Sequence, residues 1–267
     1  MNNNYVHGYN PRENERLSDQ ASTLTELLHG DTHYPVGSRV LEAGCGVGAQ
    51  TLTLASRSPQ AQFTCIDISD ASIALARERV AQAGHRNVEF QQADVFALPF
   101  ETASFDHIFV CFVLEHLAQP VEALTILRKL LRPGGTLTVI EGDHGLTAFH
   151  PDNAAARAAI QCQVELQSRA GGNALIGRQL QPLMTAAGLT DVHVSPRMVY
   201  VDGSRPEWAE GFTRNTFTAM IQGVREPALA AGLIDAQRFD EGVRALLRTA
   251  ESDGVFCYTF FKAVGVV

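Results

Sequence analysis

The segment at residues 40–51, VLEAGCGVGAQT, combines residue types that can hold a nucleotide. Its three glycines, Gly44, Gly46 and Gly48, follow an apolar run and occupy every second position. Glycine lets a backbone turn tightly and approach a ligand closely, and a helix that begins after such a loop offers free N–H groups. We therefore expect a nucleotide cofactor here, with a tight strand-to-helix turn that binds nothing as the alternative.

Acidic residues accompany this loop and the ends of two further predicted strands. Asp67 ends the strand after the loop helix, where a carboxylate can accept hydrogen bonds from both ribose hydroxyls. Asp94 ends the next strand and could accept from an adenine amino group; a solvated acid or a helix cap is the alternative. Glu42 precedes the first glycine and would meet a cationic amino group or hold the loop backbone, because a carboxylate in an apolar strand needs a partner.

Alternating strands and helices must position these residues. Strands are predicted at 39–43, 62–68, 87–94, 104–114 and 135–143, and helices at 18–29, 49–57, 70–83 and 121–131. Such a β-α repeat indicates a parallel sheet with helices on both faces. Further elements are predicted as helices at 153–169 and 178–187, strands at 190–201 and 254–266, and a helical insertion at about 206–252.

The composition and charge of the chain narrow the classes of function that it can have. The 267 residues are 45% hydrophobic, which is enough for a sizeable core, and the formal net charge is −8. Without a Lys/Arg-rich run, that charge argues against a nucleic-acid or anionic-membrane surface. We also find no apolar stretch of roughly 20 residues for a membrane span and no secretory signal. The five cysteines are far apart and odd in number, which predicts reduced thiols and a cytoplasmic protein.

Taken together, the motifs resemble the class I S-adenosylmethionine-dependent methyltransferases, in their bacterial small-molecule branch. They cover about residues 39–143 in the order VLEAGCGVG, CIDIS, ADVFALPF, FDHIFVCFVLEHL and LRPGG. The resemblance implies a Rossmann-like α/β fold whose seven-stranded, mostly parallel sheet has the order 3-2-1-4-5-7-6, with an antiparallel last strand and a helical cap insertion. It implies an N-terminal lid and helix at 1–30 and a methyltransferase domain at 31–267.

The resemblance also implies S-adenosylmethionine as the cofactor and assigns roles to individual residues. The glycine loop would approach the methionine part, Glu42 would act near its amino group, Asp67 would hold the ribose, and Asp94 with Val95 would hold the adenine. The complete set of implied cofactor-binding residues is Glu42, Gly44, Cys45, Gly46, Gly48, Asp67, Ile68, Asp94, Val95, Cys111, Phe112 and, from the lid, Tyr9 and Arg16.

Methyl transfer from a sulfonium is an in-line displacement, so much of its catalysis is positioning. An oxygen, nitrogen or acidic carbon acceptor can also require a general base. His144 is our first candidate, with Glu141 and His116 beside it; each has a structural alternative as a buried or cofactor-facing group. The run EGDHG brings titratable residues close together, which favours shifted pKa values. No strong ligand spacing is present, and we expect no metal.

We expect the partner to be a small, aromatic or hydrophobic metabolite, and the sequence is also compatible with a homodimer. Aromatic residues in the 206–252 insertion could line a substrate pocket, or simply pack, since Trp208, Phe212 and Phe217 have near-helical spacing.

Two other classes of function remain open. An NAD(P)-dependent Rossmann oxidoreductase would share the loop, because Gly44, Gly46 and Ala49 satisfy the looser dinucleotide pattern. It should also carry a hydride-transfer site such as Tyr-x-x-x-Lys. Tyr258 and Lys262 have this spacing, but they lie in a predicted strand and do not form such a site. A non-catalytic cofactor-binding protein would bind without turnover.

Overall fold

The computed structural model describes residues 24–267. The predicted lid residues Tyr9 and Arg16 therefore lie outside the described residues. Two compact units make up the chain. Among the described residues, unit 1 holds Leu24, Gly142–Leu175 and Arg197–Phe260, and unit 2 holds Thr25–Glu141, Ile176–Pro196 and Phe261–Val267. The expected division into a lid and one methyltransferase domain stays a prediction.

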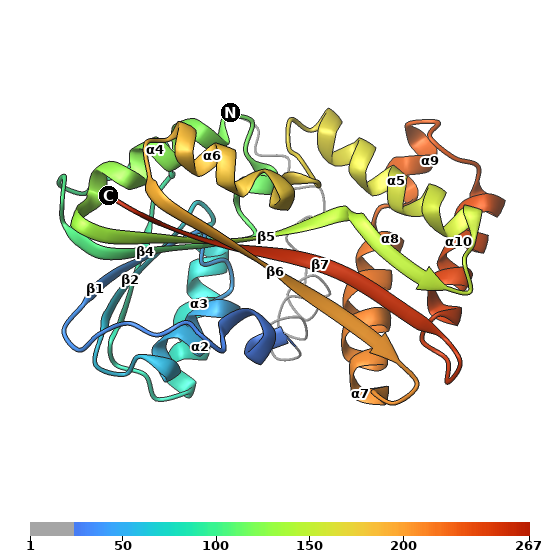
Figure 1. Ribbon diagram of the computed structural model, residues 1–267, viewed down its shortest axis with the longest axis horizontal. Helices are drawn as coiled ribbons and strands as arrows, with labels where there is room; N and C mark the ends of the chain where they lie inside the picture. The colour runs from blue at the N-terminus through green and yellow to red at the C-terminus, as the bar shows by residue number, and fades with distance from the viewer. Residues whose placement is uncertain (1–23) are drawn as a thin grey trace. The chain divides into compact units, whose positions relative to one another are not determined.

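A seven-stranded sheet has the order β3-β2-β1-β4-β5-β7-β6 (Figure 1), which confirms the predicted order. The strands are β1 (Arg39–Ala43), β2 (Gln62–Asp67), β3 (Val88–Gln92), β4 (Phe105–Cys111), β5 (Leu131–His150), β6 (Thr190–Asp202) and β7 (Val255–Val266). The first five strands pair in parallel. β7 runs opposite to β5 and β6, and in unit 2 the backbone N–H of Gly134 donates to the carbonyl of Val267 at 2.8 Å.

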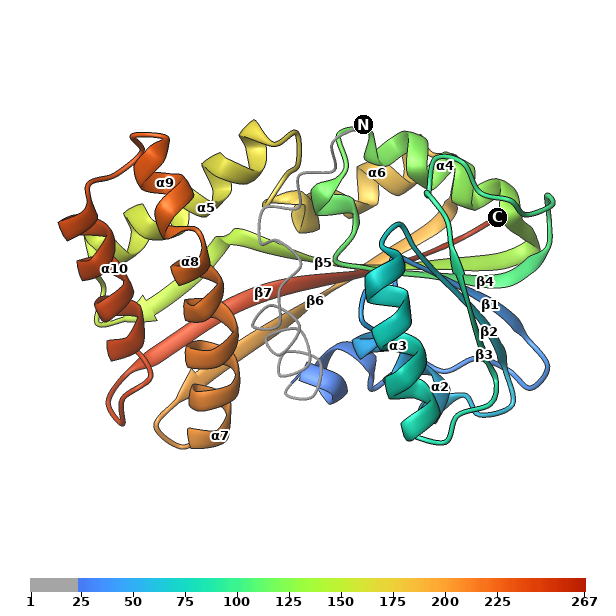
Figure 2. The same ribbon diagram turned by 180° about the vertical axis from the view of Figure 1, so that it is seen from behind.

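Helices cover both faces of the sheet in unit 2, as Figures 1 and 2 show. α2 (Ala49–Arg57) and α3 (Asp70–Gln82) lie on one face, and α4 (Pro120–Leu130) and α6 (Leu180–Ala186) lie on the other. Both faces of the central strands are consequently apolar, as expected for a parallel sheet. The core under α4 and α6 includes Leu41, Ile108, Val110, Leu137, Val139, Leu124, Leu127, Leu180 and Met184.

Local sequence signals explain where these helices begin and end. Ser69 caps α3, because its hydroxyl accepts from the Ser72 N–H at 3.2 Å. The same helix stops before Gly84, which has the left-handed φ of +79° that a glycine adopts without strain. α4 carries a proline in its first turn, where the missing N–H costs no hydrogen bond.

Unit 1 contains most of the remaining helices, including those in the 206–252 segment that was predicted to be helical. They are α5 (Ala154–Arg169), α7 (Pro206–Trp208), the π-helical segment η3 (Ala209–Thr218), α8 (Ala219–Gly223), α9 (Arg225–Ala230) and α10 (Ala236–Arg248). α10 packs on α5 through Gly242, where a Cβ would meet the carbonyl of Ala155. An aromatic cluster forms the core of this unit and comprises Phe149, Phe212, Phe217, Phe256, Tyr258 and Phe260.

Two predicted strand ends differ from the structure. β4 ends at Cys111 rather than at Leu114, because Phe112 has a φ of +57° and turns the chain out of the sheet. β5 continues to His150 rather than ending at Asp143. Glycine weakens a strand signal in sequence, but here Gly142 has a packing role, since a Cβ at this position would meet the hydroxyl of Tyr258.

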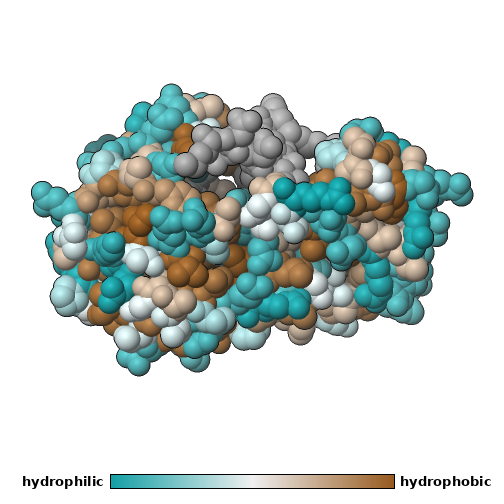
Figure 3. All heavy atoms as spheres, turned by 90° about the horizontal axis from the view of Figure 1, so that it is seen from above, coloured by the Kyte–Doolittle hydropathy of each residue, from teal (hydrophilic) through white to brown (hydrophobic). Residues whose placement is uncertain are grey.

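The surface mixes polar and apolar side chains, and Figure 3 shows hydrophilic and hydrophobic residues interspersed over the face that it displays. Over residues 24–267, no helix has both the length and the apolar character that crossing a bilayer requires.

The end of the helical turn at residues 24–29 is tied to the rest of unit 2 by buried polar contacts. The ammonium group of Lys262 donates to Asp31 Oδ1 and to Thr32 Oγ1, both at 2.6 Å. His29 is 1% exposed, and its Nε2 lies 2.7 Å from Gln50 Oε1 at the start of α2. These contacts hold residues 29–32 against β7 and the start of α2, next to the glycine loop.

His29 should make the fold sensitive to acid. Burial lowers the pKa of its imidazole from 6.5 to about 4. Between these values the unfolded chain binds the extra proton, so stability present above pH 6.5 is lost as the pH falls toward 4. The full shift corresponds to about 3 kcal/mol.

We expect His29→Gln, whose amide can still reach Gln50, to remove this dependence. Urea unfolding at pH 4 to 7 should show wild type losing stability relative to the variant on acidification. The matched substitution His33→Gln, at an exposed histidine, should leave the wild-type profile unchanged. A constant difference between wild type and His29→Gln across this range would contradict the prediction.

Candidate functional site

The three loop glycines differ in the surroundings that a side chain would meet at each position. Gly44 has a φ of +81°, and a Cβ there would collide with the side chain of Val113. Gly48 also has a positive φ, and its Cβ position is 3.0 Å from Ala76 Cβ. At Gly46, whose φ is +51°, a Cβ would meet nothing within 4 Å. The loop is therefore packed against protein at its two ends and open over Gly46, where a ligand has room to approach.

Asp67 lies against this loop at the end of β2. Its Oδ2 accepts from the Gly46 N–H at 2.8 Å, and its Oδ1 accepts from the Ser69 N–H at 2.9 Å. Burial raises the pKa of this carboxyl above its ordinary value, while the backbone donors lower it. Each carboxylate oxygen has a second lone pair, so Asp67 can hold the loop and still accept from ligand hydroxyls.

Glu42 lies beneath the loop in β1 and is 2% exposed. Its Oε2 accepts from the hydroxyl of Thr51 at 2.6 Å and from the thiol of Cys65 at 3.2 Å. The expected partner of this strand carboxylate is thus supplied by α2 and β2. Burial raises the pKa of Glu42 to about 7, and these two donors reduce the shift.

Glu42 should make unit 2 less stable at alkaline pH. Because its folded-state pKa of about 7 exceeds the ordinary 4.5, its contribution is fully present below pH 4.5 and is lost as the pH rises through 7. The loss approaches about 3 kcal/mol. We expect Glu42→Gln, which keeps an acceptor for Thr51, to gain stability over wild type between pH 5 and 9 in guanidinium unfolding. Parallel curves for the two proteins would refute this.

Asp94 and its neighbours follow β3. Asp94 is exposed, which agrees with the alternative of a solvated acid, and its Oδ1 accepts from the Phe96 N–H at 2.9 Å within a turn rather than at a helix start. Val95 is half-buried. Two large apolar side chains stand exposed after the neighbouring strands, Ile68 at 42% and Phe96 at 37%. An acid and exposed apolar side chains at these strand ends are the residue types that a base with an amino group requires.

The turn after β4 brings Cys111 and Phe112 to the end of the strand. Cys111 is 8% exposed, and burial raises the pKa of its thiol. The Phe112 N–H donates to the carbonyl of Ile140 in β5 at 2.9 Å. Cys45, on the glycine loop, is likewise a buried free thiol. Burial also raises the pKa of the Cys45 thiol, and raised pKa values disfavour both cysteines as nucleophiles.

Two of the three base candidates belong to unit 2. Glu141 is fully buried, and its Oε1 accepts from the N–H groups of Val113 and Leu114 at 3.0 and 2.7 Å. Burial raises its pKa well above the ordinary value, and the charge of Glu115 adds to the shift. His116 Nε2 lies 3.6 Å from Glu115 Oε1, with 23% of the His116 side chain exposed.

His144 lies in unit 1 and is 5% exposed. Its Nδ1 is 3.1 Å from the Ala174 carbonyl and 3.2 Å from the Tyr258 hydroxyl, and its Nε2 is 3.5 Å from the Met220 sulfur. Its ring also packs against Phe217. The three candidates are thus divided between the units, and their catalytic role stays a prediction.

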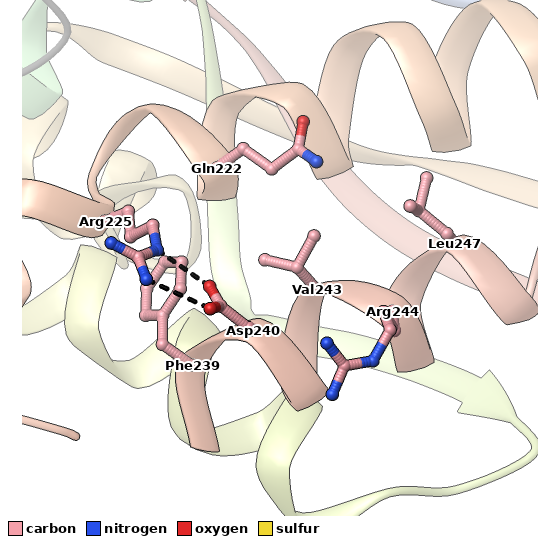
Figure 4. A pocket seen from close by; sticks show the side chains of 7 residues that line it. All are labelled: Gln222, Arg225, Phe239, Asp240, Val243, Arg244 and Leu247. Carbon is pink, nitrogen blue, oxygen red and sulfur yellow. Dashed lines mark hydrogen bonds and ion pairs between the residues drawn. The ribbon is translucent and has the colours of Figure 1, made fainter. Parts of the chain in front are cut away.

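A separate pocket of about 400 Å³ lies in unit 1 between α8, α9 and α10, and it contains none of the predicted site residues (Figure 4). Arg225 forms a bidentate ion pair with Asp240 there, at 2.7 and 3.0 Å. Within residues 24–267, no group of three or more His, Cys, Asp or Glu side chains is arranged to hold a metal ion.

Sequence reasoning missed the partners that hold the site together. Thr51 and Cys65 share one oxygen of Glu42, and Val113 fills the space beside Gly44. A polar residue inside an apolar strand signals that some partner exists. The identity of that partner depends on which strands and helices become neighbours, and periodicity does not contain this information.

The fold and loop define a class of protein. The strand order and the antiparallel seventh strand are those implied by the resemblance to class I methyltransferases, and the acids of β1 and β2 lie at the glycine loop. Residues 40–135 match the family model described as "Methyltransferase domain".

Known proteins are similar over most of the chain. An uncharacterized 37.1 kDa protein in transposon TN4556 of Streptomyces fradiae is 35% identical over 217 residues, covering 80% of this chain and 61% of that protein. The 27-O-demethylrifamycin SV methyltransferase of Amycolatopsis mediterranei is 28% identical, covering 89% and 81%. A solved structure of Haemonchus contortus phosphoethanolamine N-methyltransferase 2 has a TM-score of 0.57 at 19% identity, covering 93% and 52%, and shows the shared fold.

Over residues 40–135 the chain is thus similar to methyltransferase domains, and over most of its length it is similar to a named methyltransferase. It spans less than two thirds of the length of the Streptomyces relative.

Proposed function

We propose that this protein is an enzyme that binds S-adenosylmethionine at the glycine loop and transfers its methyl group to a small molecule. The observation that carries the proposal is the Asp67 carboxylate bound to the Gly46 N–H, at the one loop glycine above which there is open space. An acid held beside an open glycine loop at the end of the second strand suits a ribose. The match of residues 40–135 to methyltransferase domains favours this reading over an oxidoreductase.

The residues present fit such a cofactor. Asp67 offers acceptors for the ribose hydroxyls, and Asp94 with Ile68 and Val95 offers an acceptor and apolar surface for the adenine. Gly44, Cys45, Gly46 and Gly48, above Glu42, would hold the methionine part, with Cys111 and Phe112 beside it.

The cofactor supplies an activated methyl group, so the protein must chiefly align the acceptor with the sulfonium and exclude water. An acceptor that carries a proton would also have to give that proton up to a base. His144, Glu141 and His116 are the proposed candidates to receive that proton.

The proposed substrate is a small aromatic or hydrophobic metabolite. Support comes from the relative that is named 27-O-demethylrifamycin SV methyltransferase. The net charge of −8 favours a small molecule over nucleic acid. Free cysteines, four of them buried, are compatible with the proposed cytoplasmic location. A homodimer stays a prediction.

The decisive experiment supplies purified protein with a donor whose methyl group carries three deuterium atoms, together with a metabolite extract. Mass spectrometry should reveal a product heavier by three mass units than its counterpart from unlabelled donor. Titration calorimetry should show binding of S-adenosylhomocysteine and none of NADH. Binding of NADH alone would support the oxidoreductase, whereas cofactor binding without any labelled product across a broad panel would support the non-catalytic alternative.

A further inference from the structure

The turn after β4 has a backbone geometry that needs outside support. Phe112 adopts a φ of +57°, which a residue with a side chain rarely takes, and it is followed directly by the single helical turn η1 (Leu114–His116). The first N–H groups of such a turn have no partner within the turn. Something else in unit 2 must satisfy them for the turn to persist.

Glu141 supplies that support from β5. One oxygen of its carboxyl accepts from both Val113 and Leu114, at 3.0 and 2.7 Å, and the side chain is fully buried. The other oxygen is buried and has no hydrogen-bond partner among the described residues. Every hydrogen bond recorded for this carboxyl is therefore directed at the turn.

The turn at residues 112–116 packs against the glycine loop. The side chain of Val113 occupies the space where Gly44 would carry a Cβ, so the two backbones can approach only with a glycine at that position. On its other side the loop is held by Ile66, whose carbonyl accepts from Gly44 and Cys45 at 2.8 and 2.9 Å. Val113 therefore sets how far the loop can move toward β4.

We propose that Glu141 is a positioning residue for the cofactor site: its carboxyl fixes the turn at Val113 and Leu114, and through Val113 it fixes the glycine loop. This inference deepens the proposed function, since the loop is where the cofactor binds. It differs from a role as general base, because an acceptor of two backbone N–H groups acts through the turn and does not need to receive a proton.

The test compares Glu141→Gln, which keeps the accepting oxygen, with Glu141→Leu, which removes it at similar volume. Hydrogen exchange of the ligand-free proteins, followed by mass spectrometry, reads the turn and the loop without any cofactor. We expect Glu141→Leu to exchange at least about tenfold faster in peptides covering residues 112–116 and 44–48, and Glu141→Gln to match wild type. Equal protection in all three proteins would overturn the proposal.

Calorimetry with S-adenosylhomocysteine and initial rates supply the functional readout. Glu141→Leu should bind at least about tenfold more weakly, and Glu141→Gln should bind within about threefold of wild type. Loss of turnover in Glu141→Gln with unchanged binding would instead make Glu141 a base and overturn the proposal. If wild type itself failed to bind, the proposed function would fail, while the exchange data would still decide whether Glu141 fixes the loop.

A second variant keeps the test valid if Glu141→Leu does not fold. Val113→Ala leaves both N–H donors in place and removes the contact with Gly44. We expect faster exchange in the 44–48 loop with the 112–116 peptide still protected. An unchanged loop in Val113→Ala would show that the turn does not hold it.

Discussion

Replacing Asp67 by alanine is expected to weaken binding of S-adenosylhomocysteine by at least about a hundredfold. The substitution removes the acceptors proposed for two ribose hydroxyls, and hydrogen bonds to a charged group contribute about 1.5–3 kcal/mol each. It also leaves the N–H groups of Gly46 and Ser69 without their acceptor, so the loop loses its support on this side.

Two related variants sharpen this result. Asp67→Asn keeps one accepting oxygen and should fall between alanine and wild type. Asp94→Ala removes an exposed acid that serves mainly the Phe96 turn, and should weaken binding by only about tenfold. Calorimetry on all three proteins ranks them directly. An Asp67→Ala protein that binds within threefold of wild type would remove the basis for placing the ribose at β2.

The second large effect is expected for Gly44→Ala, which should destabilise the protein by about 2–5 kcal/mol. Alanine in the left-handed region costs about 1–2 kcal/mol, and forcing an extra carbon into packed surroundings costs about 1–3 kcal/mol more. Both costs apply at Gly44, which has a φ of +81° and the Val113 side chain in the way. Urea unfolding measures the loss.

The chain offers a matched control and a rescue for this substitution. Gly84 has nearly the same φ, +79°, but a Cβ there meets nothing within 4 Å, so Gly84→Ala should lose only about 1–2 kcal/mol. Adding Val113→Ala to Gly44→Ala should recover part of the loss, giving a favourable coupling energy in a double-mutant cycle. Equal losses at Gly44 and Gly84 would show that the contact with Val113 contributes nothing.

Local patterns in the sequence were sufficient to predict most of the strands and helices. The glycine loop after β1, the capping serine of α3 and the alternation of strands and helices are each encoded within about a dozen consecutive residues. The strand order and the identity of the cofactor came instead from the resemblance, because motifs in a fixed order carry information that periodicity lacks. The helical insertion was predictable as helix but not as a unit with its own aromatic core.

What escaped prediction depends on long-range neighbours. The bonds from Glu141 to the β4 turn join residues 27 and 28 positions apart, and Tyr258 reaches His144 across 114 positions. Phe112 was expected to continue a buried strand because its side chain is apolar. The chain turns there instead, and the buried Glu141 carboxyl holds the turn by accepting from the two backbone N–H groups that follow Phe112. The end of β5 was predicted too early, at Asp143, because glycines in a sequence favour the end of a strand.

The path of the chain through the two units constrains how such a protein can diversify. Among the described residues, unit 1 is built from Leu24 and two longer, separate stretches, and β5, β6 and β7 each contain residues of both units. Exchanging unit 1 between relatives by recombination therefore requires paired crossovers inside strands rather than one cassette replacement. Ending the gene after residue 141 would delete β6 and β7 and leave β5 as an open sheet edge, a template for aggregation. Gradual substitution within unit 1 is the less disruptive path.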